Sequence, residues 1–259
     1  MILDHTERFD TKDYHLNPDS KIGCYLIHGF TSTTYEVRDL AHLLAANGYR
    51  VVAENLPGHG TTVDDCNRVK YTDWLTHTEQ GFAKLYSECD SVFVGGVSMG
   101  SLLAINLSQM FPVAGLITAA PLIEFLHRLK TKYLNPFMCM FISKLTKGGR
   151  YPKNVRDTYK FYGYNYYPMR AINQVQKMTD LIRENIHKIK SPILIQFAEN
   201  DVTLPPSNAK IIRDSVSSEN IWYSGYKKTT HNMWDNDLEK DVIHQEVLHF
   251  MNSISGMDK

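Results

Sequence analysis

A Gly-x-Ser-x-Gly motif occupies residues 96–100, directly after the apolar run 92–94 and before a helical pattern that starts at Ser101. A sharp turn between a strand and a helix lifts a serine hydroxyl clear of the sheet, where it can attack a substrate. Such a turn favours glycine, because residues without a Cβ tolerate unusual dihedral angles and a close approach of strand and helix. The motif predicts Ser98 as a nucleophile; a glycine-rich turn that merely contains a serine is the alternative.

A serine nucleophile requires a base that takes its proton and an acid that orients this base. When the serine lies on a strand-to-helix turn of this kind, the acid and then the histidine follow it along the chain. Three histidines follow the last predicted strands, namely His231, His244 and His249. The last two fall within the predicted final helix, whereas His231 lies in a loop after strand 221–223, at the sheet edge where open α/β sheets bind ligands. We therefore predict His231 as the base.

The acid candidates are Asp201 and its neighbour Glu199, which follow the predicted strand 193–198. Both lie at the carboxyl end of that strand, on the same edge of the sheet as the histidine loop. Asp201 is further past the strand end, where loop residues reach the crevice. We predict Asp201 as the acid, with turn formation or helix capping as its structural alternative.

Acyl transfer also requires hydrogen-bond donors for the negative oxygen that develops on the attacked carbonyl group. The backbone N–H of Met99, the residue after the nucleophile, supplies one donor, and a loop after an early strand supplies the second. The loop that begins at His28 follows the predicted strand 22–27 and makes the Phe30 N–H the candidate. Because His28 precedes the serine in the chain, we assign it to shaping this loop and not to proton transfer.

The elements that must position these residues form an alternating pattern along the chain. Apolar runs typical of fully buried strands alternate with amphipathic helical patterns, which predicts parallel βαβ units with helices on both faces of the sheet. The predicted strands are 22–27, 49–53, 92–95, 115–119, 193–198 and 221–223. The predicted helices begin near Val37, Tyr71, Ser101, Ser207 and Leu238.

This alternation is interrupted between residues 121 and 190, where helical patterns occur without a clear strand. We predict that residues 121–190 form a mainly helical cap inserted into an α/β core of residues 1–120 and 191–259. The segment is rich in aromatic and methionine side chains, which favours an apolar acyl or aryl group in the ligand. The alternative is that these side chains form the core of the cap itself.

The composition limits other classes of function. The chain of 259 residues is long enough for one α/β domain with a sizeable core. Lys plus Arg and Asp plus Glu both number 28, and this balance gives no support for a nucleic-acid partner. The four cysteines are widely separated and form no zinc or redox motif. No signal-peptide pattern and no apolar run of membrane-spanning length occurs, so we expect a cytoplasmic protein without a transmembrane segment.

The motifs resemble those of the α/β-hydrolase family, and within it the small bacterial carboxylesterases and monoacylglycerol lipases. The resemblance covers nearly the whole α/β body and is weakest in the cap. It is carried by His28-Gly29-Phe30-Thr31, Pro57-Gly58-His59-Gly60-Thr61, Asp73-Trp74, the motif at 96–100, and the stretch from Asp201 to Ala209. It implies the α/β-hydrolase fold and a reaction that needs no metal ion or cofactor.

Two departures from the family pattern stand out. Ser101 occupies a position where the group often has a further glycine. The monoacylglycerol lipases use a carboxylate in the cap to hold glycerol, and the corresponding stretch 159–168 has none. The second departure weakens the expectation of glyceride specificity.

The sequence therefore predicts serine-dependent hydrolysis of carboxylic esters through an acyl-enzyme intermediate. The expected substrates are short- to medium-chain esters or monoacylglycerols. A fold of this kind does not determine the leaving group, so a thioesterase, an amidase, a carbon–carbon hydrolase or an aryl (cinnamoyl-type) esterase on the same residues is the alternative. A receptor without catalysis, whose cap closes on a small ligand, is a further alternative from another class.

Overall fold

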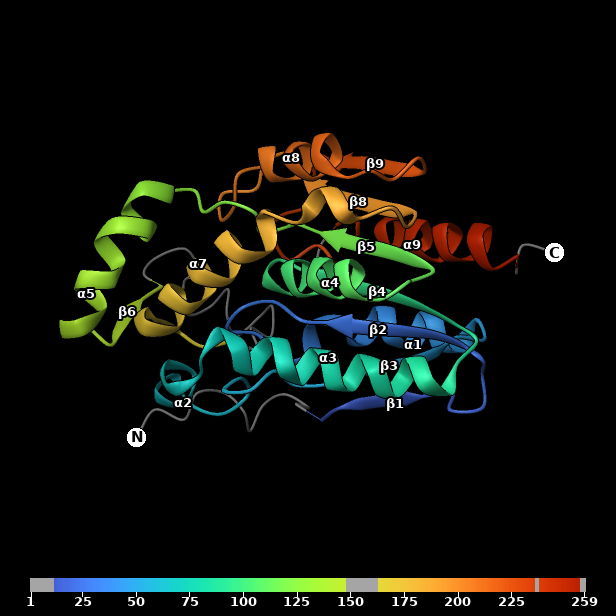
Figure 1. Cartoon of the computed structure of the whole chain (residues 1–259), viewed down its shortest axis with the longest axis horizontal. Coiled ribbons are helices and arrows are strands. Elements are labelled where there is room, and N and C mark those ends of the chain that lie inside the picture. The colour runs from blue at the N-terminus through green and yellow to red at the C-terminus, as the bar shows by residue number, and fades with distance from the viewer. Residues whose placement is uncertain (1–11, 148–162, 236–237, 257–259) are drawn as a thin grey trace.

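The computed structural model describes residues 12–147, 163–235 and 238–256 (Figure 1). Its centre is a seven-stranded sheet in the order β1-β3-β2-β4-β5-β8-β9. β1 runs antiparallel to β3, and the other neighbouring pairs of this sheet are parallel. The strands are β1 (Tyr14–Leu16), β2 (Ile22–Ile27), β3 (Arg50–Ala53), β4 (Ser91–Val97), β5 (Gly115–Ala119), β8 (Ile193–Ala198) and β9 (Ile221–Tyr226).

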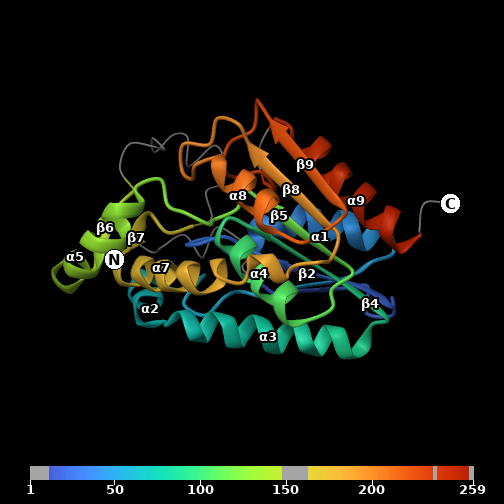
Figure 2. The same ribbon diagram turned by 45° about the horizontal axis from the view of Figure 1, so that its top comes forward.

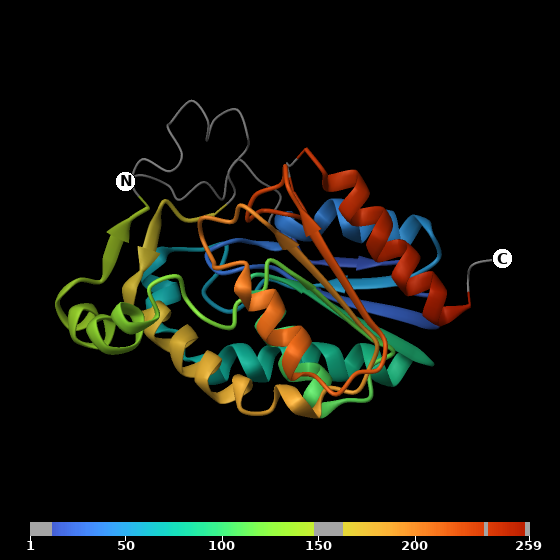
Figure 3. The ribbon, with the colours of Figure 1, turned by 90° about the horizontal axis from the view of Figure 1, so that it is seen from above.

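Helices cover both faces of this sheet, which Figure 3 shows between two helical layers. On one face, Leu44 of α1 and Phe250 of α9 belong to the same buried cluster. On the other face, Phe82 of α3, Leu103 of α4 and Ile212 of α8 belong to a second cluster. The bounds are η1 (Thr34–Val37), α1 (Arg38–Ala46), α2 (Val63–Arg68), α3 (Tyr71–Glu88), α4 (Met99–Met110), α8 (Ser207–Ser215) and α9 (Lys240–Ser255).

The two central strands explain why the sequence shows apolar runs without polar alternation. Every residue of β5 is buried, and so is every residue of β4 except Ser91. A parallel strand covered on both faces must bury alternate side chains in both directions. The doubly covered parallel sheet predicted from the sequence is therefore the observed one.

Between β5 and β8 the chain forms a separate group of elements, which we call the inserted segment. Its first elements lie beyond the carboxyl ends of the strands, at one end of the molecule, and its last helices run back along the core toward β8, as Figures 1 and 2 show. Its described elements are the π-helix η2 (Lys130–Leu134), α5 (Asn135–Phe141), β6 (Lys144–Thr146), β7 (Tyr166–Pro168), α7 (Met169–Arg183) and the short 3-10 helix η3 (Ile186–Lys188). Val175 and Met178 of α7 join the buried cluster of α3 and α4.

The structure differs from the sequence prediction in four short elements. β6 and β7 form an antiparallel pair in which Leu145 lies opposite Tyr167, although no strand was expected in this segment. β1 and α2 were also not predicted. A strand of three residues is too short to show a period of two, and α2 spans six residues, fewer than two helical turns. No helix in the described residues is long and apolar enough to cross a membrane.

Candidate active site

Ser98 lies on the turn between β4 and α4, with φ 56° and ψ −116°. Residues other than glycine rarely adopt a positive φ, and backbone strain of this kind is concentrated at functional sites. The flanking glycines make the turn possible. A Cβ on Gly96 would lie 2.1 Å from the carbonyl oxygen of Gly100, and a Cβ on Gly100 would lie 2.1 Å from that of Ile27. Both positions therefore exclude any larger residue unless the backbone moves.

Hydrogen bonds from the two serines of this region hold the turn to the neighbouring strand. The Ser98 N–H donates to the carbonyl oxygen of Ala119 at 2.9 Å. The buried hydroxyl of Ser101 lies 2.7 Å from the carbonyl oxygen of Gly96 and 3.0 Å from that of Ala119. Ser101, which departs from the family pattern, thus ties the ends of β4 and β5 together at the turn.

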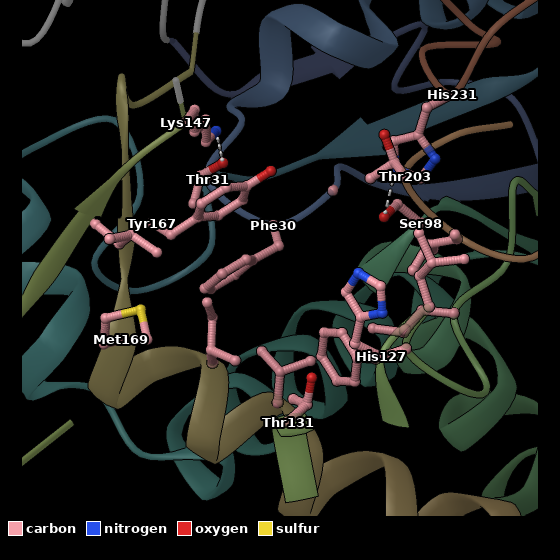
Figure 4. A pocket seen from close by; sticks show the side chains of 18 of the residues that line it. Phe30, Thr31, Ser98, His127, Thr131, Lys147, Tyr167, Met169, Thr203 and His231 are labelled. Atoms are coloured by element: carbon pink, nitrogen blue, oxygen red, sulfur yellow. Dashed lines mark hydrogen bonds between the residues drawn. The ribbon is translucent and has the colours of Figure 1, made fainter. Parts of the chain in front are cut away.

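The structure brings Ser98, His231 and Asp201 together from three separate places in the chain. Figure 4 shows Ser98 and His231 side by side. Nε2 of His231 lies 3.0 Å from Oγ of Ser98, and Nδ1 lies 2.7 Å from Oδ2 of Asp201. Because the carboxylate can only accept a hydrogen bond, Nδ1 carries the proton and donates it to Asp201. This tautomer leaves the lone pair of Nε2 directed at the serine hydroxyl, as a general base requires.

The carboxylate of Asp201 is fixed by its own loop. Its Oδ1 accepts hydrogen bonds from the N–H groups of Thr203 at 2.7 Å and Leu204 at 3.1 Å. Burial raises the pKa of Asp201, but the hydrogen bond and charge of His231 and these two amides outweigh burial and hold the pKa below its usual value. Asp201 is therefore ionised at neutral pH. The rival candidate Glu199 is exposed, and it makes no hydrogen bond to His231 in the described structure.

The two later histidines are engaged elsewhere. Nε2 of His244 is buried in α9 and donates to the carbonyl oxygen of Trp234 at 3.1 Å. The ring of His249 contacts the ring of Trp222 with 5.2 Å between centroids. Neither of them makes a described hydrogen bond to Ser98.

The backbone amides of Phe30 and Met99 have no hydrogen-bond acceptor among the described residues. Met99 is the first residue of α4, where an N–H has no partner within the helix. Phe30 follows Gly29, and a Cβ on Gly29 would lie 3.3 Å from the Cβ of Ser98. Both amides thus belong to backbone that adjoins the serine, as an oxyanion site requires.

Two buried side chains shape the loop that carries Phe30. Nδ1 of His28 lies 2.8 Å from the carbonyl oxygen of Gly29, and its Nε2 accepts from the Leu56 N–H at 3.0 Å. Burial lowers the pKa of His28, so the ring is neutral. Glu36 was missed by sequence reasoning; its Oε2 accepts the Gly29 N–H at 2.6 Å. Burial raises the pKa of Glu36 to about 7, against the opposing effect of the Gly29 amide.

Ser98 and His231 open into a cavity of about 440 Å³, which lies between the core loops and the inserted segment (Figure 4). Most of its lining is apolar, which suits the hydrophobic part of a small ligand. The apolar side chains are Phe30, Leu122, Phe125, Leu126, Leu134, Met138, Leu145, Met169, Ile172, Val175 and Leu204. The described residues contain no group of three His, Cys, Asp or Glu side chains that could hold a metal ion.

A family model described as serine aminopeptidase, S33, matches residues 18–239. The chain belongs to this family. This membership and the curated relatives of the chain confirm the predicted resemblance to α/β-hydrolases of the esterase and monoacylglycerol lipase group. They also confirm the expectation that the chain is an enzyme.

Two curated relatives of this S33-family chain come from bacilli. A thermostable monoacylglycerol lipase of Bacillus sp. (strain H-257) is 28% identical over 206 residues, covering 76% of this chain and 77% of the relative. A carboxylesterase of Bacillus subtilis (strain 168) is 25% identical over 231 residues, covering 88% and 92%. A solved structure from work on the metagenome-derived lipolytic enzymes LipS and LipT has a TM-score of 0.84 at 23% identity, covering 94% of this chain and 98% of that one. This similarity confirms the predicted fold.

Proposed function

We propose that the chain hydrolyses carboxylic esters, with Ser98 as nucleophile, His231 as general base and Asp201 as the residue that orients the base. The observation that carries the proposal is the continuous hydrogen-bonded chain from Ser98 through His231 to Asp201, with distances of 3.0 and 2.7 Å. Ser98 and His231 line an apolar cavity, and the family and relatives of the chain support the same chemistry.

In the first half of the reaction, Oγ of Ser98 attacks the ester carbonyl carbon while its proton passes to Nε2 of His231. The ionised Asp201 stabilises the resulting imidazolium. The carbonyl oxygen becomes negative and accepts hydrogen bonds from the Phe30 and Met99 amides, a contribution of about 3–4 kcal/mol for a well-placed donor. The bond to the alcohol oxygen then breaks, and His231 returns its proton to this oxygen. The alcohol leaves, and the acyl group stays on Ser98.

In the second half, water takes the place of the alcohol. His231 removes a proton from the water as its oxygen attacks the acyl carbon of the Ser98 ester. The same amides hold the negative oxygen. The bond to Oγ breaks, the proton on His231 returns to Oγ, and the carboxylic acid is released with the enzyme restored.

The proposed substrates are short- to medium-chain esters or monoacylglycerols with an apolar acyl or aryl group. The cavity volume of about 440 Å³ and its apolar lining support this class. Among its described lining residues, Glu36 is the single carboxylate, and it accepts the Gly29 N–H. The described part of stretch 159–168, from residue 163 onward, contains no carboxylate, and residues 159–162 lie outside the described residues. These observations favour simple esters over glycerides.

We further propose that residues 121–190 act as a cap on a core of residues 1–120 and 191–259. The cavity is lined from both sides, by Ser98 and Leu204 from the core and by Met138 and Ile172 from the inserted segment. Part of this segment, 148–162, lies outside the described residues. Exchange of the inserted segment is therefore expected to change which acyl group is accepted while Ser98 remains the site of attack.

A fluorophosphonate probe and an ester panel test the proposal. We expect one covalent adduct, on the peptide that contains Ser98, and loss of both labelling and ester hydrolysis in Ser98→Ala. Ser253→Ala is the matched control, because Ser253 is an exposed serine on α9. Full esterase activity in Ser98→Ala, or labelling of another residue, would overturn the mechanism.

Matched ester, thioester and amide substrates with the same acyl group separate the alternative leaving groups. We expect the ester to have the highest kcat/KM, although the family description includes an aminopeptidase. A higher kcat/KM for the amide or thioester would replace the proposed substrate class and leave the roles of the three residues unchanged. Tight ligand binding with negligible turnover of all three would indicate a receptor.

A further inference from the structure

Thr31 occupies a strained position beside the proposed oxyanion amide. It has φ 63°, a value that a β-branched residue rarely adopts, and its side chain is buried. It lies in the tight turn closed by the hydrogen bond from the Ser32 N–H to the carbonyl oxygen of Gly29 at 3.2 Å. A strained backbone persists only when its surroundings hold it in place. The contacts of Thr31 therefore decide where the neighbouring Phe30 amide lies.

Two hydrogen bonds from the inserted segment converge on Thr31. The Tyr164 N–H donates to its carbonyl oxygen at 2.9 Å, and Nζ of Lys147 donates to its Oγ1 at 2.5 Å. Figure 4 shows the Lys147 nitrogen directed at the Thr31 hydroxyl, on the opposite side of Phe30 from His127. The backbone N–H of Lys147 in turn donates to the carbonyl oxygen of Asn165 at 3.1 Å. The residue after β6 and the residues just before β7 are therefore paired with each other where they contact Thr31.

The core holds the same turn from its other side. Oε2 of Glu36 accepts the Gly29 N–H at 2.6 Å. Phe30 thus lies between two fixed neighbours, Gly29 bound to the core and Thr31 bound to the inserted segment. Burial lowers the pKa of Lys147 to about 7, and the charge of Glu36 opposes this change.

We propose that Lys147 is a positioning residue, which holds Thr31 and through it keeps the Phe30 N–H aimed at the developing oxyanion. This inference rests on the proposed ester hydrolysis. It makes the inserted segment a participant in the chemical step as well as a wall of the substrate cavity. An ester too small to reach the rest of this segment must still depend on Lys147.

A direct contact with substrate is the competing role, since Lys147 also lines the cavity. The two roles differ in their dependence on substrate size. A positioning residue lowers kcat for every ester and changes KM little, because the oxyanion forms only in the transition state. A contact residue changes KM for large esters and leaves an acetate ester unaffected.

The experiment measures kcat and KM for p-nitrophenyl acetate and p-nitrophenyl octanoate in a small set of variants. Lys147→Met removes the donor, Thr31→Val removes the acceptor while remaining β-branched, and Lys147→Arg restores a charged donor. Lys144→Met is the matched control, because Lys144 is an exposed lysine of β6 that does not line the cavity. Ser98→Ala reports separately on the proposed reaction, and the thermal unfolding midpoint of each variant reports on folding.

Loss of a whole oxyanion donor lowers kcat by ~10²–10³, so a displaced donor is expected to lower it about tenfold or more. We expect this loss with both esters in Lys147→Met and Thr31→Val, no further loss in the double variant, partial rescue by Lys147→Arg, and no change in Lys144→Met. Should Lys147→Met not fold, Thr31→Val tests the same bond from the other partner.

Wild-type kcat on acetate in both single variants would overturn the positioning role, and so would a loss confined to KM of the octanoate. A multiplicative loss in the double variant would also overturn it, because the two changes would then act independently. If Ser98→Ala is inactive in these cases, ester hydrolysis by Ser98 stands and only the role of Lys147 fails. Activity in Ser98→Ala would mean that the proposed reaction itself fails.

Discussion

Replacement of Glu36 by glutamine should make the stability of the protein less sensitive to pH. Glu36 is 5% exposed, and burial raises its pKa from 4.5 to about 7. A glutamine oxygen can still accept the Gly29 N–H, which Oε2 accepts at 2.6 Å, so the variant removes the charge and preserves the hydrogen bond. The change in charge is therefore separated from the change in shape.

The sign of the effect follows from proton linkage. Below pH 4.5 the glutamate carries its proton in both the folded and the unfolded chain, and it contributes nothing to pH dependence. Between pH 4.5 and about 7 the unfolded chain loses this proton first, so the free energy of unfolding falls as the pH rises, by about 1.4 kcal/mol for each pH unit. Above pH 7 both states are ionised, and the loss levels off at about 3 kcal/mol.

Chemical unfolding between pH 4 and pH 9 measures this effect. The free energy of unfolding of Glu36→Gln minus that of the wild type should rise by about 3 kcal/mol between the two ends of this range. Glu219→Gln is the control, because Glu219 is exposed and its replacement should leave the difference flat. A flat difference for Glu36→Gln as well, or a difference that falls with pH, would refute the assignment of a buried, destabilising carboxylate beside the turn that carries Phe30.

Three further outcomes are expected. Asp201→Asn should lower kcat by ~10³–10⁴ with little change in KM, because the amide favours the wrong tautomer of His231; steady-state kinetics on a short-chain ester measures this. Gly100→Ala should destabilise the fold by about 2–3 kcal/mol in chemical unfolding, because its Cβ would lie 2.1 Å from the carbonyl oxygen of Ile27. Burial lowers the pKa of His244 to about 4, so the unfolded chain binds its proton first as the pH falls from 6.5, and this histidine increasingly destabilises the protein toward pH 4. In the same unfolding series, the free energy of unfolding of His244→Gln minus that of the wild type should therefore rise as the pH falls from 6.5 to 4.

Local sequence pattern and strand order were sufficient to predict that Ser98, Asp201 and His231 lie close together. Ser98 lies within a motif of five residues, and Asp201 and His231 each follow a strand that its apolar run identifies. Parallel strands end at one edge of the sheet, so the order of the strands brings these loops together in the structure at 3.0 and 2.7 Å.

Two contacts of the turn that carries Phe30 could not be predicted in this way. Glu36 lies just before the predicted start of a helix at Val37, and nothing in the sequence separates it from an ordinary acidic residue of a first helical turn. Lys147 and Thr31 are 116 residues apart, and Lys147 follows a strand of only three residues. Such a pair becomes visible only when the inserted segment is placed against the core, because no periodic pattern connects them.

The central claim is that Ser98 carries the acyl group during catalysis. It is tested most directly by the masses of peptides from enzyme that is quenched during turnover. A p-nitrophenyl ester is mixed with the enzyme, the reaction is quenched in acid within the first turnovers, and peptides are analysed by mass spectrometry. We expect one acyl group on the peptide that contains Ser98, formed together with a burst of p-nitrophenol, and neither signal in Ser98→Ala. Turnover without an acyl group on this peptide, or an acyl group carried by another residue, would contradict the account.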